Sequence, residues 1–155
     1  MESLVVPRPT RSTPERRIRF LLAEGDACVR SHVSDYASEL AGLAVLVADD
    51  GAEALRLGLQ RGPQVALLDV SLPRLGGIEV AMTLRELRPQ MRIALHATDP
   101  FPYRDRATEL RLPLFDKREL YPFFGWLEFQ VRSFAPTAFT RVTAPSHAAR
   151  RPRAV

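Results

Sequence analysis

Short apolar runs alternate with longer amphipathic stretches between residues 18 and 131. Five runs are apolar almost throughout, which is typical of strands buried on both faces of a parallel sheet. They lie at residues 18–23, 43–48, 65–68, 91–95 and 112–115. The stretches between and after them repeat apolar residues at three- and four-residue steps and predict helices. These helices are expected at residues 29–40, 52–59, 78–87, 103–110 and 119–131.

Residues that start or stop helices stand at the predicted boundaries. Asp26 is placed to cap the first helix and Gly42 to end it. Gly62 closes the second helix, and Pro89 stops the third because proline cannot continue a helix. The boundaries of the pattern are therefore supported by local chemistry as well as by periodicity.

Strands that alternate with helices imply a parallel sheet, because each crossover between parallel strands needs a helix. The right-handed crossover rule then gives an open sheet with helices on both faces. We predict an α/β fold, a flavodoxin-like three-layer sandwich with five parallel strands, five helices and strand order 2-1-3-4-5. In such sheets ligands bind beyond the carboxyl ends of the strands, so functional residues are expected at that edge.

Length and composition narrow the class of protein. The 155 residues suit one ordinary domain, and 46% hydrophobic with 26% charged residues is typical of a water-soluble globule. Residues 1–16 and 133–155 combine Pro, Ser, Thr and Arg without apolar periodicity, so we expect disordered extensions around a domain at 17–132. No apolar run reaches the length of about 18 residues that a membrane span needs. The single cysteine, Cys28, interpreted as a small buried residue, fits a reducing compartment, and we expect a cytoplasmic protein.

The positive charge lies at the two ends of the chain. Residues 1–17 hold four arginines against two glutamates, and residues 133–155 hold four arginines and no acid, so the body between them carries −2 of the net +4. A mildly acidic body argues against specific nucleic-acid recognition by the fold itself.

Charged side chains follow the predicted strands at the carboxyl edge. Glu24 and Asp26 follow the first strand, Asp69 the third and Lys117 the fifth, while His96 and Ala97 follow the fourth. Carboxylates gathered at one edge repel each other, and a hard cation such as Mg²⁺ relieves that repulsion. A lysine opposite them is suited to hold a phosphoryl oxygen.

Three segments carry a family resemblance. They read LLAEGDACVR at 21–30, VALLDVSLPRLGGIEV at 65–80 and LFDK at 114–117. The middle segment is the most specific, because it joins an apolar strand, an aspartate, a proline four residues later and a glycine before the next helix. The chain resembles the receiver domain of two-component response regulators, which has a CheY-like fold, over about residues 18–131.

The resemblance implies roles for the residues at this edge. Asp69 would accept a phosphoryl group from a histidine kinase or phosphotransfer protein, with Mg²⁺ as cofactor. The metal ligands would be Glu24, Asp26, Asp69 and the backbone carbonyl of Ser71. Lys117 would hold a phosphoryl oxygen, His96 and Ala97 would occupy the switch position, and Pro73 with Gly77 would shape the loop. Such a domain is not an enzyme beyond its own phosphorylation and dephosphorylation.

The chain departs from the receiver pattern at two positions. Gly25 stands where the family has a second acid, and Asp26 either substitutes for that acid or only caps the helix. His96 replaces the expected Ser or Thr hydroxyl, and it either donates to a phosphoryl oxygen or is a half-buried residue at a strand end.

Two functions therefore remain open at this point. One is a stand-alone receiver that signals through a downstream protein, since only about 23 residues follow the last predicted helix, and that self-associates through its last two helices. The alternative is a pseudo-receiver that never takes phosphate and acts as an interaction module. A nucleotide- or flavin-binding enzyme on the same fold is disfavoured because the chain has no G-x-G-x-x-G and no P-loop.

Overall fold

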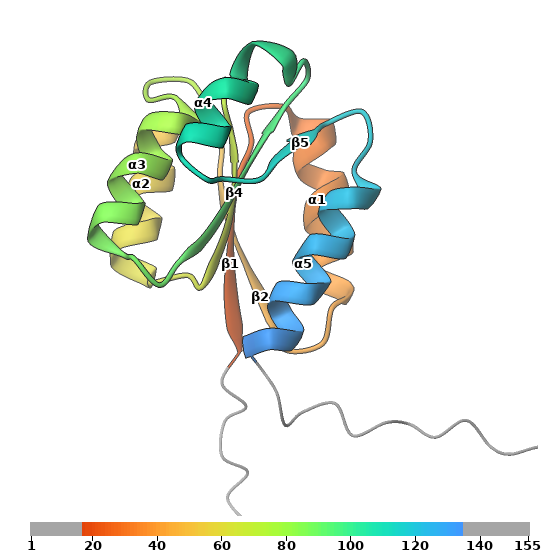
Figure 1. Ribbon diagram of the computed structural model, residues 1–155. Coiled ribbons are helices and arrows are strands. Elements are labelled where there is room, and N and C mark those ends of the chain that lie inside the picture. Colours follow the sequence, from red (N-terminus) through yellow and green to blue (C-terminus); the bar gives the residue numbers. More distant parts are fainter. Residues whose placement is uncertain (1–16, 135–155) are drawn as a thin grey trace, which may run out of the picture.

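The computed structural model describes residues 17–134 as an alternation of strands and helices (Figure 1). The strands are β1 (Ile18–Ala23), β2 (Leu43–Ala48), β3 (Val65–Asp69), β4 (Arg92–Ala97) and β5 (Leu114–Asp116). The helices are α1 (Ala27–Glu39), α2 (Gly51–Arg61), α3 (Gly77–Leu87), η1 (Phe101–Tyr103, a 3-10 turn), α4 (Arg104–Glu109) and α5 (Tyr121–Phe134). None of these helices is long and apolar enough to cross a membrane.

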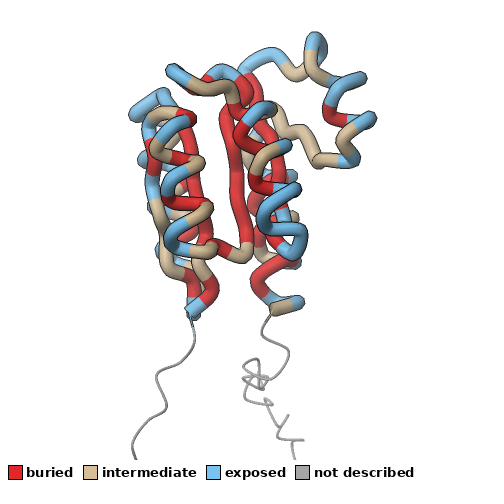
Figure 2. The backbone as a smooth tube through the Cα atoms, turned by 90° about the vertical axis from the view of Figure 1, so that its left-hand side faces the viewer, coloured by how far each residue is buried: buried red, intermediate tan, exposed pale blue. Residues whose placement is uncertain are grey.

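The five strands form one parallel sheet in the order β2-β1-β3-β4-β5, which confirms the predicted fold. Helices α2 and α3 cover one face of the sheet, and α1 and α5 cover the other (Figure 1). The inner strands β1, β3 and β4 are buried between these two layers, and the edge strands β2 and β5 are partly exposed (Figure 2). All strands point the same way, so their carboxyl ends meet at one edge of the sheet.

Several element boundaries differ from the prediction. Strand β4 extends through Ala97, so His96 and Ala97 lie inside the strand and not after it. The cause is pairing on both sides, since His96 is in register with Asp69 of β3, and Ala97 with Asp116 of β5. Helix α5 begins at Tyr121 and continues through Phe134, two residues beyond the predicted end of the domain. The extensions predicted at 1–16 and 133–155 lie outside the described residues, apart from residues 133 and 134, which belong to α5.

Helix α1 begins where the sequence places its cap. The Asp26 carboxylate accepts hydrogen bonds from the backbone N–H groups of Cys28 at 2.8 Å and Val29 at 3.0 Å. Cys28 itself is exposed, so its interpretation as a buried residue is wrong. It stands in the first turn of α1, where residues 25–28 are all exposed.

Two glycines allow the β3–α3 loop to lie close against its neighbours. A Cβ at Gly77 would stand 2.1 Å from the backbone oxygen of Asp69, and one at Gly51 would stand 1.7 Å from that of Leu75. The N–H of Gly51 also donates to the carbonyl of Pro73 at 3.0 Å. The loop after Asp69 is therefore held tightly by α2 and by the start of α3.

Candidate functional site

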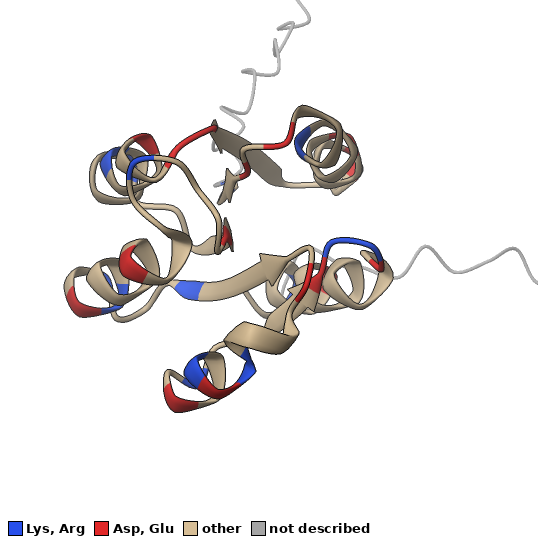
Figure 3. Ribbon diagram, turned by 90° about the horizontal axis from the view of Figure 1, so that it is seen from above, with Lys and Arg blue, Asp and Glu red and all other residues tan. Residues whose placement is uncertain are grey.

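Four charged or titratable side chains converge at the carboxyl edge because of strand alternation. Successive residues of a strand point to opposite faces of the sheet, and every second residue lines the same face. The face covered by α1 and α5 is lined by Phe20, Leu22, Val65, Leu67, Ala94 and Phe115. The same alternation carried to the strand ends places Glu24, Asp69, His96 and Lys117 on this face. Seen from the carboxyl edge, acidic and basic segments lie together around the strand ends (Figure 3).

Lys117 links the two carboxylates of the site. Its Nζ lies 2.7 Å from Oδ2 of Asp69 and 3.0 and 2.9 Å from the two carboxylate oxygens of Glu24. Burial alone would lower the pKa of the Lys117 ammonium, but its hydrogen bonds with Asp69 and Glu24 raise it. Lys117 therefore carries a positive charge between two negative ones.

Glu24 is fully buried, and both of its carboxylate oxygens lie close to nitrogen atoms. Its Oε1 accepts from the backbone N–H of Asp26 at 2.7 Å as well as from Lys117. Burial raises the pKa of the Glu24 carboxyl, but the contacts with His96 and Lys117 and the Asp26 N–H outweigh it and lower this pKa to about 2. Glu24 is thus a buried carboxylate that stays ionised because nitrogen atoms surround it.

His96 is completely buried, not half-buried as one interpretation of the sequence had it. Its Nε2 lies 3.0 Å from Oε2 of Glu24, an ion-pair distance, although the two groups are not aligned as a hydrogen bond. Its Nδ1 has no hydrogen-bond partner within residues 17–134. The side chain at the switch position is therefore turned toward Glu24.

Asp69 ends β3 with only 3% of its surface exposed. Its Oδ1 accepts from the backbone N–H of Ser71 at 2.9 Å, while Oδ2 faces Lys117. Ser71 is exposed in the following loop, and the carbonyl of the buried Ala97 accepts from the backbone N–H of Lys117 at 3.0 Å. The structure thus brings together Asp69, Lys117, Glu24 and His96, and it uses Ala97 to fix the start of the β5–α5 loop.

The predicted Mg²⁺ ligands do not form an oxygen cage of the kind that this ion requires. Both oxygens of Glu24 contact nitrogen groups, and one oxygen of Asp26 caps α1. Gly25 supplies no carboxylate. In the described part of the chain, no group of three or more His, Cys, Asp and Glu side chains is arranged to hold a metal ion. The donor set therefore does not fit Mg²⁺, which takes several well-placed oxygen ligands.

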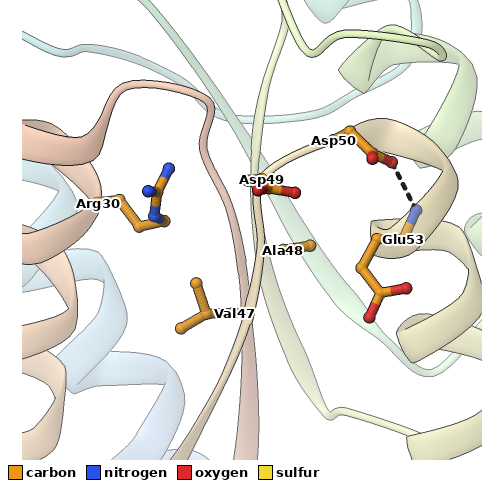
Figure 4. Close-up of a pocket in the computed structure, with 6 residues that line it drawn as sticks. All are labelled: Arg30, Val47, Ala48, Asp49, Asp50 and Glu53. Carbon is orange, nitrogen blue, oxygen red and sulfur yellow. Dashed lines mark hydrogen bonds between the residues drawn. The ribbon is translucent and has the colours of Figure 1, made fainter.

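A separate surface pocket lies beside this site, between the β1–α1 and β2–α2 connections (Figure 4). The acids of this pocket do not take the place of the carboxylate that is missing at position 25. Asp50 accepts from the backbone N–H of Glu53 at 2.8 Å, and Asp49 is exposed. Across the pocket, Arg30 donates to the carbonyls of Glu24 at 2.8 Å and Gly25 at 3.2 Å. Sequence reasoning missed Arg30, because an arginine in the second turn of a helix has no specific signature.

Comparison with known proteins gives a consistent result. The family model for the response regulator receiver domain matches residues 20–111. Response regulator GacA of Pseudomonas viridiflava is 32% identical over 91 residues, which are 56% of this chain and 42% of that protein. The chain thus spans less than half the length of this curated relative.

Solved structures show the same fold. The N-terminal domain of an uncharacterized protein from Wolinella succinogenes has a TM-score of 0.68 at 25% identity, covering 77% of this chain and 98% of that one. The response regulator domain of Thermotoga maritima CheB has a TM-score of 0.61 at 21% identity, covering 76% and 96%.

Proposed function

This chain belongs to the response regulator receiver domain family, and we propose that Asp69 is the residue on which it accepts a phosphoryl group. The donor would be the phosphohistidine of a histidine kinase or phosphotransfer protein. The observation that carries the proposal is the 2.7 Å contact between Lys117 Nζ and Asp69 Oδ2 at the carboxyl edge of the sheet. That contact joins a carboxylate nucleophile to a fixed cation.

Phosphoryl transfer to Asp69 requires from the protein mainly correct positioning and compensating charge. An Asp69 oxygen forms a bond to phosphorus while the phosphorus–nitrogen bond of the donor breaks, and the imidazole leaves with the electron pair. Negative charge spreads over three equatorial oxygens, which need positive charge or donors nearby. Lys117 and the backbone N–H of Ser71 stand next to Asp69 and can supply both. Receiver domains generally bind Mg²⁺ in an acidic pocket, where the ion adds to this neutralisation.

Intact-mass spectrometry after incubation with acetyl phosphate tests this proposal. We expect a mass gain of one phosphoryl group in the wild type and none in Asp69→Asn. Asp49→Asn is the matched control, because Asp49 is an exposed carboxylate of the same edge, and it should gain the group like the wild type. A gain that persists in Asp69→Asn would contradict the assignment of the acceptor.

A phosphorylation-independent interaction module is the second candidate. The specific observation in its favour is the buried contact between Glu24 and His96. This contact joins the acid that follows β1 to the switch position without any phosphoryl group. In that case no variant would take the group from acetyl phosphate at any Mg²⁺ concentration. Both functions act through protein contacts, as expected of a signalling domain.

Helix α5 is the surface that we propose for self-association. It leaves Phe129 65% exposed, which is unusual for so large an apolar side chain. Sedimentation velocity tests the idea: Phe129→Ser should weaken self-association, and a wild type that stays monomeric at high concentration would contradict it.

A further inference from the structure

The two buried carboxylates of the site already contact nitrogen groups of the protein. Asp69 faces Lys117, and Glu24 lies between Lys117 and His96. In a pocket that binds a divalent cation through carboxylates, those oxygens are the ligands and must be free to turn toward the ion. Here the nitrogen atoms of two side chains hold them.

We infer that the contacts of Glu24 with Lys117 and His96 occupy the place of the divalent cation in this receiver, so that the wild-type pocket binds Mg²⁺ or Mn²⁺ only weakly. The cause has two parts. Glu24 is committed to nitrogen partners, and Gly25 leaves the pocket one carboxylate short. Each part rests on contacts of this chain and can be changed separately.

Glycine at position 25 is not required by the backbone. The glycines with positive φ in residues 17–134 are Gly42 and Gly62, so Gly25 adopts a conformation open to other residues. A Cβ built there meets only Pro73 Cδ at 3.7 Å and the Asp49 carbonyl oxygen at 3.9 Å, which are ordinary contacts. A carboxylate can therefore be added without rebuilding the site, and its absence is a matter of charge and not of space.

Arg30 adds further positive charge on the same side. Its guanidinium hydrogen bonds to the carbonyl oxygens of Glu24 and Gly25 hold it at the end of β1. A fixed positive charge next to a cation site weakens cation binding by direct repulsion. Arg30 and Gly25 thus act in the same direction.

The test is Mn²⁺ binding to the full chain, measured by electron paramagnetic resonance of the free ion without any phosphodonor. We expect Gly25→Asp to bind Mn²⁺ at least about tenfold more tightly than the wild type. Gly25→Asn is the matched control, because it has the same shape without the charge, and it should stay close to the wild type. Tight, saturable binding by the wild type that is lost in Asp69→Asn would overturn the inference, and so would equal affinities of the two Gly25 variants.

A second pair of variants tests the role of the nitrogen groups. In the Gly25→Asp background, His96→Thr removes one of the two nitrogen contacts of Glu24 Oε2 and should tighten Mn²⁺ binding again. Arg30→Gln in the same background removes a partly exposed cation that holds no core, so it gives a result even if the His96 variant fails to fold. Unchanged affinity in both would overturn the part assigned to the nitrogen groups of the protein. Because no phosphate is present, these outcomes are separable from failure of Asp69 as the acceptor.

Discussion

The loop after β3 and the ends of β1 and β4 lie at the same edge of the sheet but are built differently. On the β3 side, Asp69 precedes a loop that packs closely against Gly77 and Gly51. The Asp69 carboxylate faces Lys117. On the β1–β4 side, Glu24 and His96 form a buried pair. His96 stands where the receiver pattern has a hydroxyl, and Gly25 stands where it has a second acid. In the proposed function, Asp69 and Lys117 form the acceptor half of the pocket, and nitrogen groups of the protein contact the carboxylate of the half that would hold the cation.

The two halves of the pocket therefore depend on different forces. The acceptor half depends on close backbone packing around a short loop. The other half depends on charge compensation in a buried place, where an unpaired ion is strongly unfavourable. Variants that disturb one half should leave the properties of the other half measurable.

The largest effect is expected from Glu24→Gln. The change removes the negative charge that Lys117 and His96 both face, and breaking a buried ion pair costs about 3 kcal/mol or more of unfolding free energy. Urea denaturation measures it. Glu119→Gln is the control, because Glu119 is exposed, and it should change stability very little. Equal stability of the two variants would show that the buried pair contributes nothing.

Acidification should remove the stabilising contribution of the same pair. The folded-state pKa of Glu24, about 2, lies below its ordinary value of 4.5, so its ionised form stabilises the fold above about pH 4.5. That contribution, roughly 3 kcal/mol, is lost as the pH falls from 4.5 toward 2. Urea denaturation at a series of pH values measures it, and the loss in this window should be smaller in Glu24→Gln. An identical acid response of both proteins would contradict the assignment.

Gly77→Ala tests the acceptor half. Its methyl group would lie 2.1 Å from the Asp69 backbone oxygen, so the loop must move, at a cost of about 2 kcal/mol. We expect lower stability and slower modification of Asp69 by acetyl phosphate. Gly125→Ala is the matched control, since its added methyl meets nothing within 4 Å in the middle of α5. That control should gain up to about 1 kcal/mol from helix propensity.

The smallest effect is expected from Tyr36→Phe, away from both halves. The Tyr36 hydroxyl donates to the Glu128 carboxylate and ties α1 to α5, and this hydrogen bond raises the pKa of Tyr36 to about 12. Its loss should cost about 1 kcal/mol of stability and leave Asp69 modification unchanged. Thermal unfolding and intact mass, measured on the same sample, check both statements.

Most of the fold could be predicted because the buried parallel strands are nearly continuous apolar runs. β1 and β2 have the predicted bounds, and Asp26 caps α1 as expected. The end of β4 was missed, since a histidine after an apolar run reads as the start of a loop. His96 lies inside the sheet because it pairs with Asp69 of β3 and Phe115 of β5, which are distant in the sequence.

The convergence of Asp69 and Lys117 was also predictable, because both residues follow strands of one parallel sheet. The contacts of Glu24 could not be predicted, because they depend on which nitrogen groups pack against this buried carboxylate. Side-chain contacts of this kind depend on packing details that periodicity does not contain. The same holds for Arg30, whose partners are backbone carbonyls.

In the proposed receiver the acceptor half of the pocket is intact and the cation half is altered. Intact-mass spectrometry of the wild type, Gly25→Asp and Asp69→Asn, after acetyl phosphate at increasing Mg²⁺, tests it most directly. The account predicts one phosphoryl group on the first two proteins, with saturation at lower Mg²⁺ in Gly25→Asp, and none on Asp69→Asn. Absence of the group from both the wild type and Gly25→Asp at every Mg²⁺ concentration would contradict it.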